Sequence, residues 1–266
     1  MRMRLRCWVL ASVAAVPLLL TGCAGSSGNA AAGSTSSSSA PSSGAATGTT
    51  AAPASGSGSG TAWGSLRGCT SGSGVPSGAA SKASVDVDGD GRRDTVWIGT
   101  DPGPDGVPFG VATAAGGGFS ATIQSASPVA RSVLLADVTG HGEVIALASD
   151  GRQVLLYGVS RCSFVPEQNA QGRQYAFDLG FTGYGTGVGC VDANGDGTTD
   201  LVGLKLVPEA YGEGTIQRTI VDIDGANARN GATDSVPVTR ATLADEAQSV
   251  SCGDLTLAQD GVTSGP

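Results

Sequence analysis

Four aspartates in the stretch DVDGDGRRD, residues 86–94, constrain the fold more than any other feature of this chain. Asp86, Asp88, Asp90 and Asp94 stand at positions 1, 3, 5 and 9, and two glycines between them let the backbone curl back. Like charges this close repel one another, and each carboxylate is costly to remove from water unless it is neutralised. A divalent cation relieves both costs, and calcium prefers about six to eight oxygen ligands from carboxylates and carbonyls. We therefore predict a calcium site formed by these four side chains and the backbone carbonyl of Arg92.

The same pattern returns as DANGDGTTD at residues 192–200. Here Asn194 offers an amide oxygen at the position where the first copy has its second carboxylate. We predict a second calcium site, and its ligands would be Asp192, Asn194, Asp196, the carbonyl of Thr198, and Asp200.

The residues around both loops exclude an EF-hand, which needs a glutamate at position 12 between two helices. Position 12 is Trp97 in the first copy and Gly203 in the second. The flanking segments are rich in apolar and β-branched residues, which favour strands. The predicted strands are 83–85, 95–98, 187–191 and 201–206. Each metal loop is therefore predicted to form the turn of a β-hairpin.

Short apolar runs bounded by glycine and acidic residues recur through the chain, while helical periodicity is hard to find, so the predicted class is all-β. Fainter copies of the loop begin at Asp137 and near Asp254. The leading aspartates at 86, 137, 192 and 254 are 51, 55 and 62 residues apart, which is about the length of a four-stranded propeller blade. The segment 219–225 has Ala226 where a third carboxylate is needed, so we predict a strand followed by a polar turn through Asn230.

Residues 80–258 resemble the FG-GAP or VCBS repeats, whose family fold is a β-propeller with calcium in DxDxDG hairpin loops. The first loop matches this motif in full, the second with Asn194 as a permitted exchange, and Phe109-Gly110 is similar to the phenylalanine-glycine element of the family. The family commonly has seven blades, which at this period would need roughly 400 residues. We therefore expect a small or incomplete β-propeller-like array of about three to four blades with calcium-binding hairpin loops. Thr139 and His141 replace carboxylates in the third loop, where we expect no calcium.

The N-terminal segment has the features of an export signal. Three arginines precede an apolar run from Trp8 to Leu20, which is too short to remain in a bilayer. The run ends in Leu-Thr-Gly-Cys23, which resembles the bacterial lipobox, so Cys23 is the predicted lipidation site. We expect a lipoprotein signal peptide at residues 1–22, a lipidated cysteine with a Ser/Gly/Ala/Thr-rich tether at 23–61, and the folded domain at 62–266. The implied location is the outer face of a bacterial cell membrane, held by a lipid anchor.

Four cysteines remain after Cys7 in the signal and Cys23, and an even number in an exported chain indicates two disulfides. Three pairings are possible. We favour Cys162 with Cys190 and Cys69 with Cys252, the second of which would join the two ends of the domain.

Charge and composition limit the function. The formal charge of −8 would become −11 after loss of three arginines and no acid with the signal, and this excludes nucleic-acid binding through a basic surface. His141 is the only histidine, so neither a serine triad nor a zinc hydrolase is supported. Trp63, Trp97 and Tyr184 could stack on a sugar, but such aromatics more often serve packing. We expect a calcium-stabilised binding module for a protein or glycan ligand of the cell envelope. An extracytoplasmic hydrolase on the same scaffold and a structural spacer remain as alternatives.

Overall fold

The computed structural model describes residues 68–180, 186–208, 214–238 and 241–265. All of them belong to one compact unit that spans Ser57–Pro266. Antiparallel sheets account for nearly all of its regular structure, and the predicted all-β class is confirmed. The predicted signal peptide, Cys23, the tether, Trp63 and Tyr184 lie outside the described residues.

The first sheet is a four-stranded meander in which each strand pairs with the next. Its strands are β1 (Ala80–Ala83), β2 (Thr95–Ile98), β3 (Val107–Ala112) and β4 (Gly118–Ile123). Apolar side chains alternate along β3, and Val107, Phe109 and Val111 are buried on one face, as expected for a strand with one core-facing side. The adjoining Gly110 lies against Trp97, since a β-carbon there would approach the indole ring to 2.4 Å. The phenylalanine-glycine pair thus combines a core side chain with a close approach that only glycine permits.

The middle sheet has the strand order β16-β5-β6-β7-β8, and β9 also pairs with β7. Its strands are β5 (Ser132–Asp137), β6 (Val144–Ser149), β7 (Gln153–Val159), β8 (Phe164–Pro166), β9 (Ala176–Asp178) and β16 (Val262–Thr263). Every residue of β6 is buried. Val144, Ala146 and Ala148 of this strand join one core, whereas Ile145 and Leu147 join another. The run of five apolar residues that begins β6 follows from the burial of this strand on both faces of the sheet.

The third sheet is a second meander of four consecutive strands. They are β10 (Thr186–Val191), β11 (Asp200–Pro208), β12 (Gly214–Asp224) and β13 (Asn227–Pro237). A short helix and a small hairpin follow, namely α1 (Ala241–Glu246), β14 (Ser251–Cys252) and β15 (Leu255–Thr256). The predicted polar turn after residue 225 is confined to Gly225 and Ala226, because Asn227–Asn230 already belong to β13.

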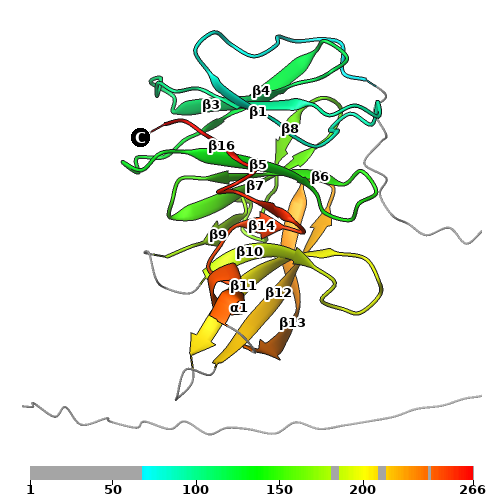
Figure 1. Cartoon of the computed structure of the whole chain (residues 1–266), viewed down its shortest axis with the longest axis vertical. Helices are drawn as coiled ribbons and strands as arrows, with labels where there is room; N and C mark the ends of the chain where they lie inside the picture. Colours follow the sequence, from blue (N-terminus) through cyan, green and yellow to red (C-terminus); the bar gives the residue numbers. More distant parts are fainter. Residues whose placement is uncertain (1–67, 181–185, 209–213, 239–240, 266) are drawn as a thin grey trace, which may run out of the picture. The chain divides into compact units, whose positions relative to one another are not determined.

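The middle sheet lies between the other two sheets (Figure 1). One apolar core forms between it and the first sheet, around Phe109, and a second forms between it and the third sheet, around Leu147. Within the described residues, none of the sheets closes on itself. The hairpin loops β1–β2, β5–β6 and β10–β11 all project to the same side, on the right in Figure 1.

The predicted number of disulfides, two, is confirmed, but the pairing that we favoured is wrong. Cys69 is bonded to Cys162, with their Cα atoms 5.8 Å apart, and Cys190 is bonded to Cys252, with their Cα atoms 4.3 Å apart. The first bond joins the segment before β1 to the turn between β7 and β8. The second joins β10 to β14. Each disulfide therefore links one sheet to a neighbouring segment, and neither links the two ends of the domain to each other.

Candidate metal centre

The first acidic loop, residues 84–94, is the turn between β1 and β2, as the sequence predicts. Asp86 organises its backbone: Oδ1 accepts a hydrogen bond from the Gly89 N–H at 2.8 Å, and Oδ2 accepts one from the Gly91 N–H at 2.7 Å. Gly89 and Gly91 have φ angles of 68° and 84°, a left-handed conformation that glycine adopts without a steric penalty. The alternation of aspartate and glycine in the sequence therefore specifies a loop that wraps around its first carboxylate.

Three carboxylates of this loop converge. One oxygen each of Asp86, Asp88 and Asp94 lies within 4.8 Å of the others, a spacing at which the three could hold a metal ion together. The Asp88 and Asp94 side chains are each only 1% exposed. Asp88 Oδ1 is buried without a hydrogen-bond partner. A buried anionic oxygen without a partner is strongly unfavourable unless a cation neutralises it.

Backbone amides from three different segments aim these carboxylates. Asp88 Oδ2 accepts a hydrogen bond from the Cys69 N–H at 2.6 Å. The two oxygens of Asp94 accept hydrogen bonds from the N–H groups of Val87 and Ala114, both at 2.8 Å. Burial raises the pKa of Asp94, and the charges of the neighbouring aspartates add to this, while the two hydrogen bonds oppose it. These hydrogen bonds fix the shape of the loop, but they do not neutralise the negative charge of its converging carboxylates.

Asp90 does not join the other three carboxylates. It accepts two hydrogen bonds from the exposed guanidinium of Arg92, at 2.6 Å and 3.0 Å. The hydrogen bond with Arg92 lowers the pKa of Asp90 below its ordinary value. Because an exposed ion pair of this kind contributes little to stability, it is readily exchanged for another cation.

The second loop, between β10 and β11, repeats the same backbone turn. Asp192 accepts hydrogen bonds from the N–H groups of Gly195 at 2.7 Å and Gly197 at 3.1 Å. The Asn194 amide group donates to Asp196 Oδ2 at 3.1 Å and to Asp200 Oδ1 at 3.4 Å. This loop is more exposed than the first. Among the described residues, the acidic cluster with a metal-ligating spacing is the one in the first loop.

The turn also recurs between β5 and β6, without most of the ligands. Asp137 accepts hydrogen bonds from the N–H groups of Gly140 at 3.0 Å and Gly142 at 2.8 Å. In place of a carboxylate at position 9, the backbone carbonyl of Glu143 accepts the hydrogen bond of the Val138 N–H at 2.9 Å. Three hairpins thus share one turn, and two of them carry the full ligand pattern. The predicted copy near Asp254 differs, since Gly253 and Asp254 form a two-residue turn between β14 and β15.

One buried acid was not singled out from the sequence. Glu167 is fully buried after β8, and neither carboxylate oxygen has a hydrogen-bond partner. Burial raises its pKa from 4.5 to about 7, while the nearby backbone N–H of Gly158 acts in the opposite direction and the charge of Glu143 adds to the rise. A single glutamate in the sequence Val-Pro-Glu gives no signal of burial, because the burial comes from neighbours distant in the chain.

Comparison with protein-family models, with curated proteins and with solved structures finds no significant match. Within the residues that the structure describes, no helix has the length and apolar character needed to cross a membrane. The function must therefore be argued from the loops and surfaces themselves.

Proposed function

We propose that the first loop binds calcium through Asp86, Asp88 and Asp94, with Asp90 turning from Arg92 to the ion. The observation that carries this proposal is the buried Asp88 Oδ1, which has no hydrogen-bond partner and lies beside two further carboxylates. An all-oxygen donor set suits a hard cation, and calcium tolerates the irregular geometry of such loops better than magnesium does. We extend the proposal to the second loop, where the Asn194 amide would turn its oxygen toward the ion.

We also propose that the three sheets are blades of a short, open, propeller-like array of the FG-GAP or VCBS kind. The support is the shared turn, which follows the first strand of a four-stranded meander in the first and third sheets. In the middle sheet the turn follows β5, and β16 pairs with the other edge of that strand. A common position in each sheet is the expected result of a repeated unit.

The bound ion would act mainly on stability. A ligand that binds only the folded state, present at about a hundredfold above its dissociation constant, stabilises it by about 2.7 kcal/mol. Calcium is plentiful outside cells, where even weak sites fill. The export signal and lipobox cysteine predicted from the sequence, together with the two disulfides, support a location on the outer face of the cell membrane.

The protein would then serve there as a binding module for an envelope component. The experiment uses the full chain in detergent, incubated with solubilised cell envelope in calcium and again in EDTA. We expect envelope material to be retained in calcium and released in EDTA, while the melting temperature falls with calcium removal. If the protein retains no envelope material in either buffer, the binding role is refuted. If the melting temperature is the same in calcium and in EDTA, the stabilising role of the metal is refuted.

A further inference from the structure

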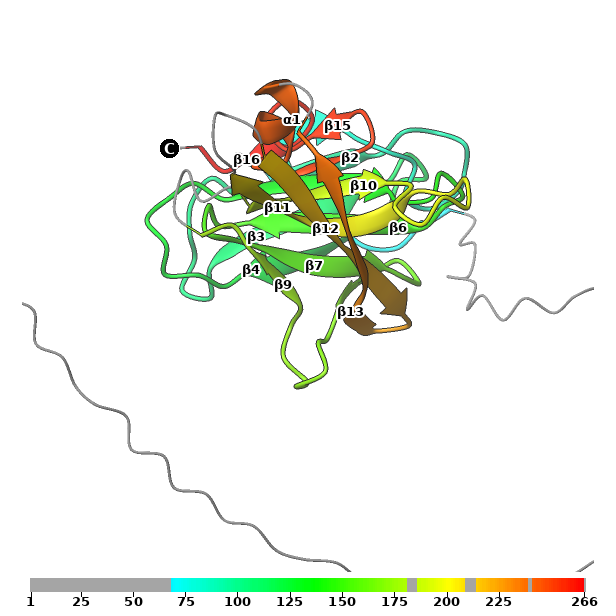
Figure 2. The ribbon, with the colours of Figure 1, turned by 90° about the horizontal axis from the view of Figure 1, so that it is seen from below.

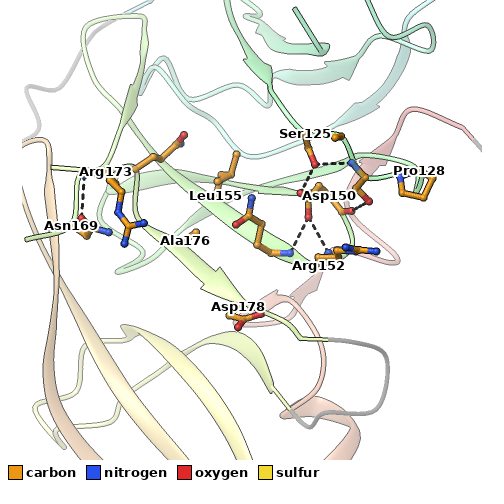
Figure 3. Close-up of a pocket in the computed structure, with 13 residues that line it drawn as sticks. Ser125, Pro128, Asp150, Arg152, Leu155, Asn169, Arg173, Ala176 and Asp178 are labelled. Carbon is orange, nitrogen blue, oxygen red and sulfur yellow. Dashed lines mark hydrogen bonds between the residues drawn. The ribbon is translucent and has the colours of Figure 1, made fainter. Parts of the chain in front are cut away.

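A polar groove of about 850 Å³ lies beside β9, away from the acidic loops. One wall is the loop Ser125–Pro128, and the other is the segment from Asn169 to Asp178, which includes the end of the β8–β9 loop. Figure 3 shows Asn169 and Arg173 at one end of the groove, Asp150 and Arg152 at the other, and Leu155 between them.

Two smaller hollows, of about 500 Å³ and 230 Å³, adjoin the same segment on the side of the third sheet. They share Ala176 with the groove and share Tyr175 with each other. Figure 2 shows the β8–β9 loop projecting beside the turn between β12 and β13, to which Gln168 is joined by backbone hydrogen bonds. The three hollows therefore adjoin one another around residues 169–178, and we call them together the β9 surface.

The charge of the β9 surface is opposite to that of the chain. Arg152, Arg173, Lys205 and Arg229 line it, against Asp150 and Asp178, in a protein whose formal charge is −8. Among the described residues, the exposed Arg173 side chain has no hydrogen bond or ion pair. Asp222 lies opposite Arg229 in the strand register and offsets part of that charge.

Asp150 carries a negative charge at one end of the groove, but its carboxylate is already engaged by the protein. The residue is 4% exposed, and its carboxylate accepts hydrogen bonds from the Ser125 hydroxyl at 2.6 Å and from the N–H groups of Arg152 and Gln153 at 2.9 Å. Four cationic side chains against two carboxylates still leave a positive balance on the β9 surface, which favours an anionic ligand.

The uncharged lining favours a ligand rich in hydroxyl groups. Gln153, Asn169 and Gln174 line the groove, and side-chain amides both donate and accept hydrogen bonds, as hydroxyl groups require. The half-buried ring of Tyr175 lines both smaller hollows. Its hydroxyl donates to Asn230 Oδ1 at 2.6 Å, and its ring packs edge-on against Phe177 at a centroid distance of 5.2 Å. A ring fixed in this way offers an apolar surface to a sugar.

We propose that the β9 surface binds an anionic oligosaccharide, with Arg173 contacting a carboxylate or phosphate group and the amides contacting hydroxyls. This inference rests on the proposed binding function and assigns it a site and a ligand class. A guanidinium suits either anion, because both accept paired hydrogen bonds from its fork of N–H groups.

The test is calorimetric titration of the full chain in calcium with two probes, a hyaluronan oligosaccharide and a phosphorylated dextran oligosaccharide. Neutral dextran is the control for a sugar without charge, and poly-glutamate is the control for negative charge without sugar. We expect the protein to bind at least one anionic glycan, and to bind it more tightly than either control. The affinity should fall as the salt concentration rises. Loss of one charge-assisted contact in R173Q should weaken binding about five- to tenfold.

The matched variant is R161Q, which removes the same charge from an exposed arginine that lines none of the three hollows. It should change the affinity less than about twofold, since exposed charges at a distance are screened by salt. Equal binding of poly-glutamate, equal effects of R173Q and R161Q, or no binding of either glycan would overturn the proposal. Envelope retention that R173Q leaves intact would overturn this site while leaving the binding role in place.

Discussion

Glu167 should make the stability of the protein fall as the pH rises, and E167Q should remove that dependence. The folded state holds this carboxyl protonated up to about pH 7, because burial disfavours its charged form. The unfolded chain releases the proton near pH 4.5. Between these values the folded state binds more protons, so its stability decreases with rising pH and then levels off above pH 7.

The size of the effect follows from the two pKa values. One pKa unit corresponds to about 1.4 kcal/mol of unfolding free energy. The rise from 4.5 to about 7 therefore changes the free energy of unfolding by about 3 kcal/mol in full, and by about 2 to 3 kcal/mol between pH 5 and pH 8. Glutamine has nearly the same shape and carries no titratable proton. E167Q should therefore gain about 2 to 3 kcal/mol relative to the original protein on going from pH 5 to pH 8.

The assay is urea unfolding of the full chain at pH 5, 7 and 8 in EDTA, so that metal binding does not vary with pH. The exposed Asp105 provides the control D105N, whose difference from the original protein should stay constant. A free-energy difference between E167Q and the original protein that does not change with pH would refute the assignment of a buried, protonated Glu167.

Three further changes test other parts of the structure. G110A should destabilise the protein by about 2 to 4 kcal/mol in thermal unfolding, because the new methyl group would collide with Trp97; a change below about 0.5 kcal/mol would contradict the tight contact. Replacing both Cys69 and Cys162 by alanine opens a link across 93 residues and should cost about 4 kcal/mol. It should also weaken calcium binding in titration, because the disulfide anchors the segment whose residue-69 N–H orients Asp88, and an unchanged affinity would show that this N–H stays in place without the disulfide. N194D adds a carboxylate to the second loop and should raise its calcium affinity, with the first loop as the internal reference; a lower affinity would argue against metal binding there.

The sequence predicted local features well, because they depend on neighbouring residues. The alternation of aspartate and glycine correctly placed a hairpin turn at both acidic loops, and strand β2 was predicted with its observed bounds, Thr95–Ile98. Asp90 was assigned to the cluster with the other aspartates, but the structure places it against Arg92, whose guanidinium reaches it from two residues away. Local pattern alone does not decide between such competing partners.

Features that depend on distant contacts were missed. The disulfide pairing follows from how the sheets stack, and spacing along the chain does not reveal it. Strand β13 has a polar sequence and forms because it pairs along the length of β12. The short helix α1 was also missed, because its six residues are too few to show an apolar periodicity in the sequence. Burial of Glu167 likewise depends on neighbours that the sequence does not identify.

The most direct test of the account is equilibrium dialysis of the full chain against radioactive calcium near neutral pH, with D88N as the comparison. We predict that the original protein retains calcium at millimolar or lower concentration and that D88N retains at least one ion less, because a buried carboxylate of the first loop is lost. Equal retention by the two proteins, or no calcium retained by either, would contradict the claim that these aspartates converge in order to hold a cation.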